Sequence, residues 1–124
     1  MGLNFNYGNA RWSYSGFHSF RKKLADEMGI DLDEMDGFKT ENNTPLGKPM
    51  PGISWGTIKD DIKYLLYHSD CDGQLSSLRC KKIIPRLRKL IKSWSGDDYD
   101  KQQALELIKG MKEAIKLNKP LKFG

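Results

Sequence analysis

The segment from Cys80 to Trp94 is the part of the sequence that most constrains how this chain folds. At 100° per residue, its apolar side chains fall within about 120° of arc, which predicts a helix with one buried face. These side chains are Cys80, Ile83, Ile84, Leu87, Leu90, Ile91 and Trp94. Pro85 removes the hydrogen bond to the carbonyl of Lys81, so it predicts a kink or a division into two helices.

Three more stretches carry helix signals. A helix is predicted over 16–28, with Ser15 as its cap and Gly29 at its end. Another is predicted from about Thr57, ending near residue 68. The last opens at three aspartates and continues to residue 118, because carboxylates favour the positive end of a helix dipole.

The remaining segments lack helical periodicity. Residues 37–56 hold seven glycines and prolines, which predicts a long loop or arm on the surface. Residues 1–14 are aromatic but aperiodic, and we expect them to pack onto the helices, with a short strand as one option. The expected fold is therefore a mainly all-α single domain over 1–124 with about four helices.

Hydropathy and cysteine content indicate the cellular compartment in which the protein is expected. The longest unbroken apolar run, residues 64–67, is far shorter than the ~20 residues that cross a bilayer. Cys71 and Cys80 do not form a disulfide scaffold pattern, so we expect two reduced thiols. The prediction is a cytoplasmic protein without a membrane partner.

The loop over 68–79 resembles the twelve-position calcium loop of an EF-hand. Asp70 and Asp72 occupy positions 3 and 5, Gly73 the sharp-turn position 6, and Leu75 the apolar position 8. With the flanking predicted helices, residues 57–91 resemble an EF-hand-like helix-loop-helix.

Both ends of this loop depart from the EF-hand pattern. Position 1 is His68, and position 12, normally a bidentate glutamate, is Arg79. The resemblance implies at most a weak, hydrated Ca²⁺ or Mg²⁺, and no resident cofactor. Its ligands would be Asp70, Asp72, the carbonyl of Gln74, and Ser76. Alternatively, the loop only turns the chain at Asp72-Gly73 while Ser76 or Ser77 caps the next helix.

Other chemistries have less support in the sequence. A zinc site would join His68, Cys71 and Cys80 with His18, but the paired C-x-x-C spacing is absent. A Cys71 nucleophile with His68 as its base lacks a third orienting group. The aspartates in 97–100 are typical of helix capping rather than of a metal cluster. We therefore predict a non-enzyme.

Charge provides the main functional hypothesis. Residues 79–92 hold seven bases and no acid, whereas residues 26–41 hold seven acids and one base. The sequence predicts a small binding or regulatory protein that engages an acidic protein surface through its basic helix. The predicted contact residues are Arg79, Lys82, Arg86, Arg88, Lys89 and Lys92.

Two alternatives for the same helix remain open. Nucleic acid is the first, although aromatic residues for base stacking are not interleaved with the bases. A merely solvated face is the second. The aromatic block 12–17 and Trp55 would fill the core, or form a partner surface if they were exposed.

Several blocks of the sequence occur together in an order that resembles a known family. The blocks are 12–17 (WSYSGF), 29–32 (GIDL), 68–73 (HSDCDG), 85–87 (PRL) and 97–100 (DDYD). In this order they resemble an uncharacterised family of small bacterial and phage-type proteins. That family usually carries an acid where this chain has Arg79, and the resemblance implies no activity.

Overall fold

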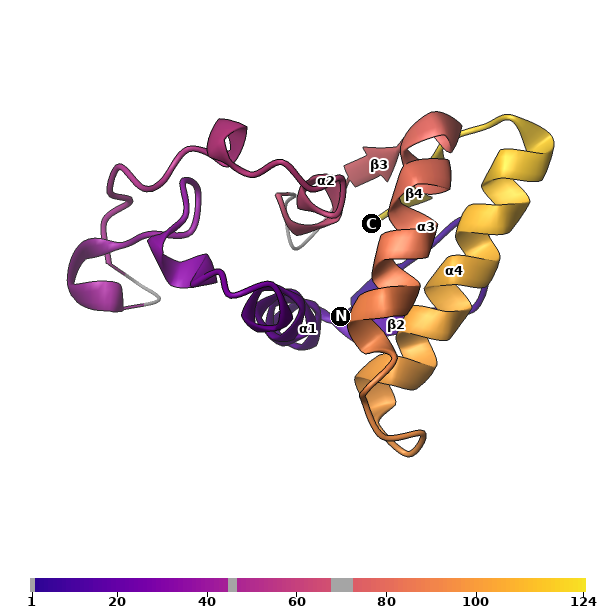
Figure 1. The fold of residues 1–124 in the computed structure, drawn as a ribbon, viewed down its shortest axis with the longest axis horizontal. Coiled ribbons are helices and arrows are strands. Elements are labelled where there is room, and N and C mark those ends of the chain that lie inside the picture. The colour runs from indigo at the N-terminus through magenta and orange to yellow at the C-terminus, as the bar shows by residue number, and fades with distance from the viewer. Residues whose placement is uncertain (1, 45–46, 68–72) are drawn as a thin grey trace.

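Helices α3 (Ser77–Ile91) and α4 (Tyr99–Leu117) lie side by side and form one face of the molecule (Figure 1). The computed structural model describes residues 2–44, 47–67 and 73–124. The side chain of Ser76 caps α3 by accepting a hydrogen bond from the Arg79 amide at 3.2 Å. α3 continues through Pro85 as one helix, so a division there is wrong.

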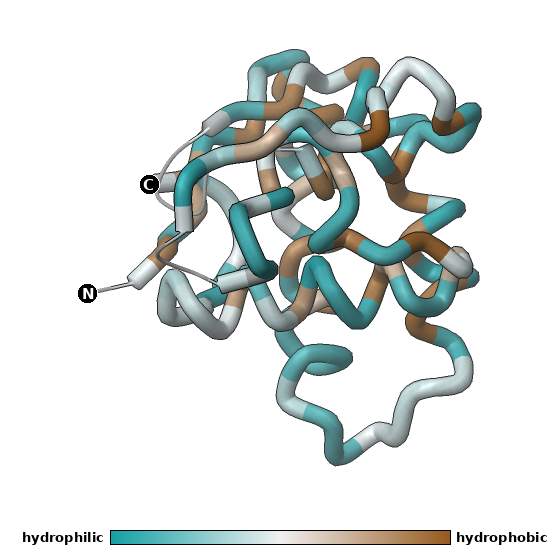
Figure 2. The backbone as a smooth tube through the Cα atoms, turned by 90° about the vertical axis from the view of Figure 1, so that its left-hand side faces the viewer, coloured by the Kyte–Doolittle hydropathy of each residue, from teal (hydrophilic) through white to brown (hydrophobic). Residues whose placement is uncertain are grey.

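Helix α1 (Tyr14–Glu27) is seen nearly end-on where α3 and α4 run in the plane of the view (Figure 1). Phe17, Phe20 and Leu24 are fully buried, as the helical period predicts. The prediction of a helix over about 16–28 is confirmed, with Ser13 in place of Ser15 as its cap. Figure 2 shows hydrophobic and hydrophilic residues alternating along the backbone, as amphipathic elements require.

Two small antiparallel sheets make the expected mainly all-α class wrong. β1 (Gly2–Asn4) pairs with β2 (Arg11–Ser13), and β3 (Gly73–Leu75) pairs with β4 (Leu121–Phe123). Helical content is 52% and strand content 15%. Each strand has only three residues, too few for a pattern of alternation, and β3 finds its partner at the other end of the chain.

The prediction of an EF-hand-like helix-loop-helix over 57–91 is wrong for its first helix. α2 (Lys63–Leu66) is a single turn, and a 3-10 turn (Trp55–Thr57) precedes it. No side chain caps α2; in the turn before it, the Asp60 carboxylate accepts a hydrogen bond from the Ile62 amide at 3.1 Å. Ile58 is extended, with φ −89° and ψ 119°, and so interrupts the helix that its spacing predicts.

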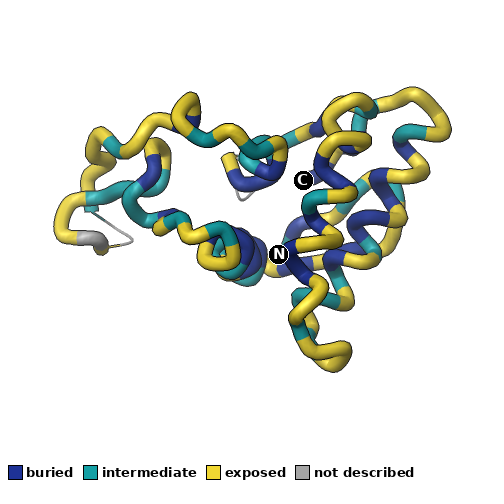
Figure 3. The backbone as a smooth tube through the Cα atoms, viewed as in Figure 1, coloured by how far each residue is buried: buried dark blue, intermediate teal, exposed yellow. Residues whose placement is uncertain are grey.

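Residues 31–58, described apart from 45–46, form an arm that projects from the rest of the fold (Figure 1). Backbone bridges join Met35 to Ile53 and Thr40 to Pro49, so the arm doubles back on itself. Most of it is exposed (Figure 3). The surface loop predicted over 37–56 is therefore present in its described residues, with only short 3-10 turns.

Aromatic residues near the N-terminus fill the core, as one of the two predictions for them stated. Trp12 stacks on Phe20 with ring centroids 4.6 Å apart, and Phe5 lies against Phe123 at 5.3 Å. The indole of Trp12 donates a hydrogen bond to Asp100 at 3.0 Å, which ties β2 to α4. Among the described residues, no helix is long and apolar enough to cross a membrane.

Candidate binding surface

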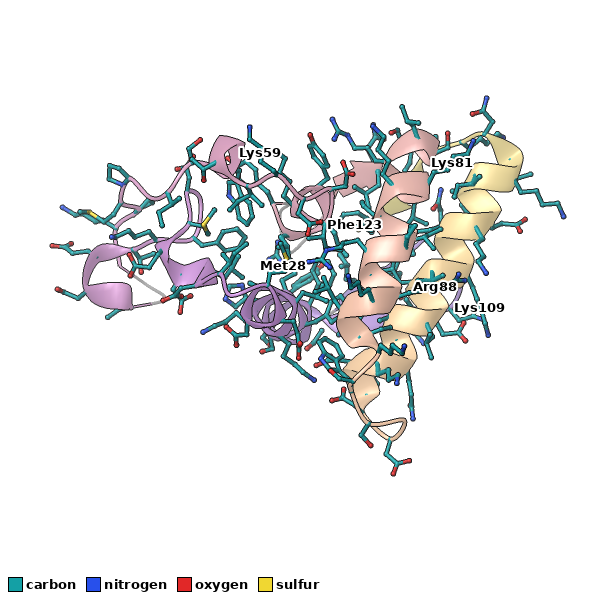
Figure 4. All side chains as sticks on the ribbon, viewed as in Figure 1. Met28, Lys59, Lys81, Arg88, Lys109 and Phe123 are labelled. Atoms are coloured by element: carbon teal, nitrogen blue, oxygen red, sulfur yellow. The ribbon has the colours of Figure 1, made fainter. Side chains whose placement is uncertain are left out.

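The predicted basic residues all lie on the side of α3 that faces away from the core. Six of them are exposed and Arg86 is half-buried, because the opposite side of the helix holds the buried apolar residues. The set, called the basic face below, is Arg79, Lys81, Lys82, Arg86, Arg88, Lys89 and Lys92. Figure 4 labels Lys81 and Arg88 on this helix.

Most charges of the basic face are not neutralised by other residues in the described part of the chain. Arg86 forms an ion pair with Asp60, and the Arg79 guanidinium lies 3.4 Å from the centroid of the Tyr64 ring. The other five bases of the face form no ion pair with any residue in the described ranges. A solvated, unpaired cluster of like charge creates a local positive potential that attracts polyanions.

Helix α4 carries lysines beside α3, but its surface charge is mixed. Lys109, Lys112 and Lys116 are exposed on α4, and Lys109 is labelled there in Figure 4. Only Lys109 has an acidic partner within the described chain, namely Glu106 at 3.0 Å. Residues 77–119 carry 12 of the 21 bases but only 5 of the 16 acids. Residues 93–119 hold five bases and five acids, so the excess positive charge of this segment belongs to α3.

A pocket with a volume of about 360 Å³ adjoins the first turn of α3. It lies where the arm, α2, β3 and α3 meet, and Arg79 belongs both to it and to the basic face. The pocket is lined by Trp55, Gly56, Lys63, Tyr64, Tyr67, Gln74, Leu75 and Arg79. We call it the aromatic pocket.

The aromatic rings of this pocket are held by stacking. Tyr67 stacks on Trp55 with centroids 5.3 Å apart and planes 14° from parallel, and the Trp55 indole donates to the Asp36 carbonyl at 2.8 Å. Hydrogen bonding from Arg79 and the nearby Lys63 charge lower the pKa of Tyr64. Tyr64 and Tyr67 are three residues apart on the α2 turn, a spacing that brings both rings to one side.

Sequence reasoning missed Tyr64 and Tyr67 as part of a site, whereas Trp55 was expected in the core or, if exposed, on a partner surface. The i, i+3 spacing of Tyr64 and Tyr67 was a usable signal, but Trp55 joins them only because the arm folds back. Lys63 is fixed at the same place, because its ammonium donates to the carbonyls of Ile58 at 3.1 Å and Trp55 at 3.4 Å. The pocket thus combines ring faces with two cations.

The predicted cation site falls mostly outside the described residues. Asp70 and Asp72, with His68 and Cys71, lie in the range that the structure does not describe. Ser76 caps α3, as the alternative interpretation of the loop predicts. Within the described ranges, no three His, Cys, Asp or Glu side chains form a group suited to a metal. Weak Ca²⁺ or Mg²⁺ binding stays a prediction.

Gln74 has a different setting from the one that an EF-hand loop would give it. Its backbone is in β3, opposite Lys122 of β4, and its exposed side chain lines the aromatic pocket. Its amide makes no side-chain hydrogen bond with another residue of the described chain. This donor and acceptor are therefore available to a ligand.

Cys80 is a core thiol rather than a zinc ligand or nucleophile. It is fully buried, its thiol donates weakly to the Leu75 carbonyl at 3.9 Å, and burial raises its pKa to about 11. His18, the proposed fourth zinc ligand, stacks on Phe38 with centroids 5.9 Å apart. A thiol with this pKa remains protonated at neutral pH, so it has little thiolate to offer.

The aspartates at the start of α4 stabilise the helix, as predicted. Asp98 accepts hydrogen bonds from the amides of Asp100 and Lys101, at 2.8 and 3.2 Å. The Lys23 ammonium bridges Asp98 and Asp100, at 2.8 and 3.2 Å, and lies 4.4 Å from the centroid of the Trp94 ring. The carboxylates are therefore occupied by capping and by α1.

Comparisons of the chain with protein-family models, with curated proteins and with solved structures find no match. The resemblance to small bacterial and phage-type proteins stays a prediction. The functional argument therefore rests on the geometry of this chain alone.

Proposed function

We propose that this chain binds single-stranded nucleic acid through the basic face of α3. The observation that carries the proposal is the run of seven bases without an acid on one exposed side of a helix, six of them without an ion-pair partner in the described chain. Phosphates spaced along a strand match such a row of cations, and the release of bound counterions favours binding. α3 offers about 22 Å of length for these contacts.

The residue types on this face favour phosphates over the acidic protein surface that the sequence first suggested. Protein interfaces are depleted of lysine and usually hold an apolar centre. The basic face has four lysines, and the exposed apolar side chains among them are Leu78 and Pro85, which lie apart on the helix. Contacts with phosphates need no apolar centre, because they depend on charge and hydrogen bonding.

The aromatic pocket supplies the element that the sequence argument lacked. Single-strand binding proteins combine a positive surface with aromatic rings on which unpaired bases stack. Here Tyr64 and Tyr67 adjoin Arg79, the first residue of the basic face. The arrangement favours a single strand over a duplex, whose bases are already stacked on one another.

Fluorescence anisotropy with labelled 20-nucleotide DNA and RNA, titrated at several salt concentrations, tests this proposal. We expect binding to weaken with salt, and the double variant Lys82→Gln/Lys89→Gln to reduce the slope of log K against log salt by about 1.4, since each lost phosphate contact removes about 0.7. Lys48→Gln/Lys59→Gln removes the same charge from two exposed positions, one on the arm and one just after it, and serves as the control.

Two results would reject nucleic acid as the partner. One is a lack of binding at low salt. The other is equal affinity for polyglutamate of matched charge and length. That result would mean that the basic face recognises acidic groups in general, and an acidic protein surface would then be the better hypothesis.

A further inference from the structure

We infer that the aromatic pocket is a nucleotide-binding site, in which an unpaired base stacks on Tyr67 while Arg79 binds the phosphate. This inference deepens the proposed function and rests on it for one point, that the nucleotide belongs to a longer strand. The affinity of the pocket for a free nucleotide does not depend on the rest of α3.

The pocket is large enough for a nucleotide and is built before the ligand arrives. Its volume of about 360 Å³ lies in the usual range of small-molecule sites, about 300–1,000 Å³. Tyr67 is 50% exposed, so part of its ring is free for stacking. Trp55 is only 6% exposed, its indole is hydrogen-bonded to the Asp36 carbonyl, and its ring stacks on Tyr67 and so holds that ring in place. A ring already held in place loses little entropy on binding.

Gly37 shows how closely the arm packs around Tyr67. A side chain at Gly37 would begin 3.0 Å from Cε1 of Tyr67, and φ at Gly37 is +87°, a value that favours glycine. The Cε1 edge of the Tyr67 ring is therefore packed against the arm.

Arg79 is suited to a phosphate. Its guanidinium carbon lies 3.4 Å from the centroid of the Tyr64 ring, a contact that limits the positions open to the side chain. It has no carboxylate partner among the described residues. An arginine in this state can donate two parallel hydrogen bonds to phosphate oxygens. Lys63 adds a second positive charge at the pocket wall.

Gln74 completes the set of groups that a nucleotide needs. Its amide offers both a donor and an acceptor, which match the polar edge of a base, and the β3–β4 pairing fixes its backbone. Ring, amide and guanidinium thus correspond to the face of the base, its edge and the phosphate. Inorganic phosphate alone would lack the stacking, and a nucleoside would lack the contact with Arg79.

Calorimetric titrations with adenosine 5′-monophosphate (AMP), adenosine and inorganic phosphate test this assignment. We expect AMP to bind at least tenfold more tightly than either part. Loss of stacking is worth about 1–3 kcal/mol per base, so Tyr67→Ala should weaken AMP binding about tenfold or more. Tyr67→Phe keeps the ring and should bind AMP normally. Arg79→Gln should reduce AMP binding to the level of adenosine.

Matched controls separate a local loss from a damaged fold. Tyr99→Ala removes a tyrosine that is 56% exposed on α4, and Lys48→Gln removes one charge from the arm; both should bind AMP as the parent does. Thermal unfolding of every variant checks that the fold persists. The inference is overturned if AMP does not bind, or if Tyr67→Ala and Arg79→Gln, still folded, bind AMP unchanged.

Titration with the 20-nucleotide strands distinguishes failure of the pocket from failure of the proposed function. If the strands bind with salt dependence and AMP does not, the basic face is supported and the nucleotide pocket is wrong. If AMP binds and the strands do not, the pocket is a mononucleotide site and strand binding is wrong.

Discussion

Replacement of Gly110 by alanine should destabilise the protein, although the same change stabilises most helices. Gly110 is buried in α4, where the backbone of the β1–β2 connection crosses it. A Cβ at Gly110 would lie 2.3 Å from the Tyr7 carbonyl oxygen and 3.0 Å from its carbon. Close C···O contacts are normally about 3.3 Å or longer, so the two backbones must separate by about 1 Å.

The expected magnitude follows from two opposed terms. Alanine gains about 1 kcal/mol over glycine in a helix interior. Overpacking costs about 1–3 kcal/mol, and the upper end applies because the obstacle is backbone and cannot rotate away. We therefore expect the free energy of unfolding to fall by about 2 kcal/mol, which corresponds to a Tm lower by about 8 °C at this chain length.

Urea unfolding followed by circular dichroism measures this change. Gly96→Ala is the matched control, because a Cβ at Gly96 meets no atom within 4 Å. It should leave the free energy of unfolding nearly unchanged. If Gly110→Ala were as stable as the parent, or more stable, the close approach of the N-terminal segment to α4 would be incorrect.

Other predictions concern the caps and the buried thiol. The hydrogen bond from Lys23 lowers the pKa of Asp98, so the stability that this carboxylate contributes is present above its unfolded pKa and is lost as pH falls through the folded pKa. Asp98→Asn should therefore be less stable than the parent at pH 7 and should lose less stability on acidification, which thermal melting at several pH values will measure. Ser76→Ala should lower the free energy of unfolding by about 1 kcal/mol through loss of the α3 cap, which urea titration checks against Ser76→Thr. In a Cys71→Ser background, Cys80 should react with a thiol reagent at pH 8 only after unfolding, because burial raises its pKa to about 11; rapid reaction of the folded protein would contradict its position in the core.

The three long helices could be predicted because each carries its own periodic pattern. Residues such as Phe17 in α1 and Leu87 in α3 are buried where the 3.6-residue period places them. The α2 segment was predicted too long, because Ile58 and Ile62 suit a helix by spacing while the chain at Ile58 is extended. Spacing alone does not reveal where the chain leaves the helical conformation.

The strands and the aromatic pocket depend on contacts between distant residues. Leu75 pairs with Leu121, and nothing in either segment of three residues identifies the other. The basic residues of α3 were identified from sequence because they share one helix. Trp55 and Tyr67 meet only after the arm folds back, so a one-dimensional pattern could not join them.

The arm also determines how the molecule orients in an electric field. Its acidic residues lie toward one end of the longest axis, and the basic face of α3 lies toward the other (Figure 1). A polyanion attracts one end and repels the other, so it turns the molecule before contact. Neighbouring copies bound along one strand would then all direct their acidic arms outward, and the bound strand would carry an outer surface of negative charge.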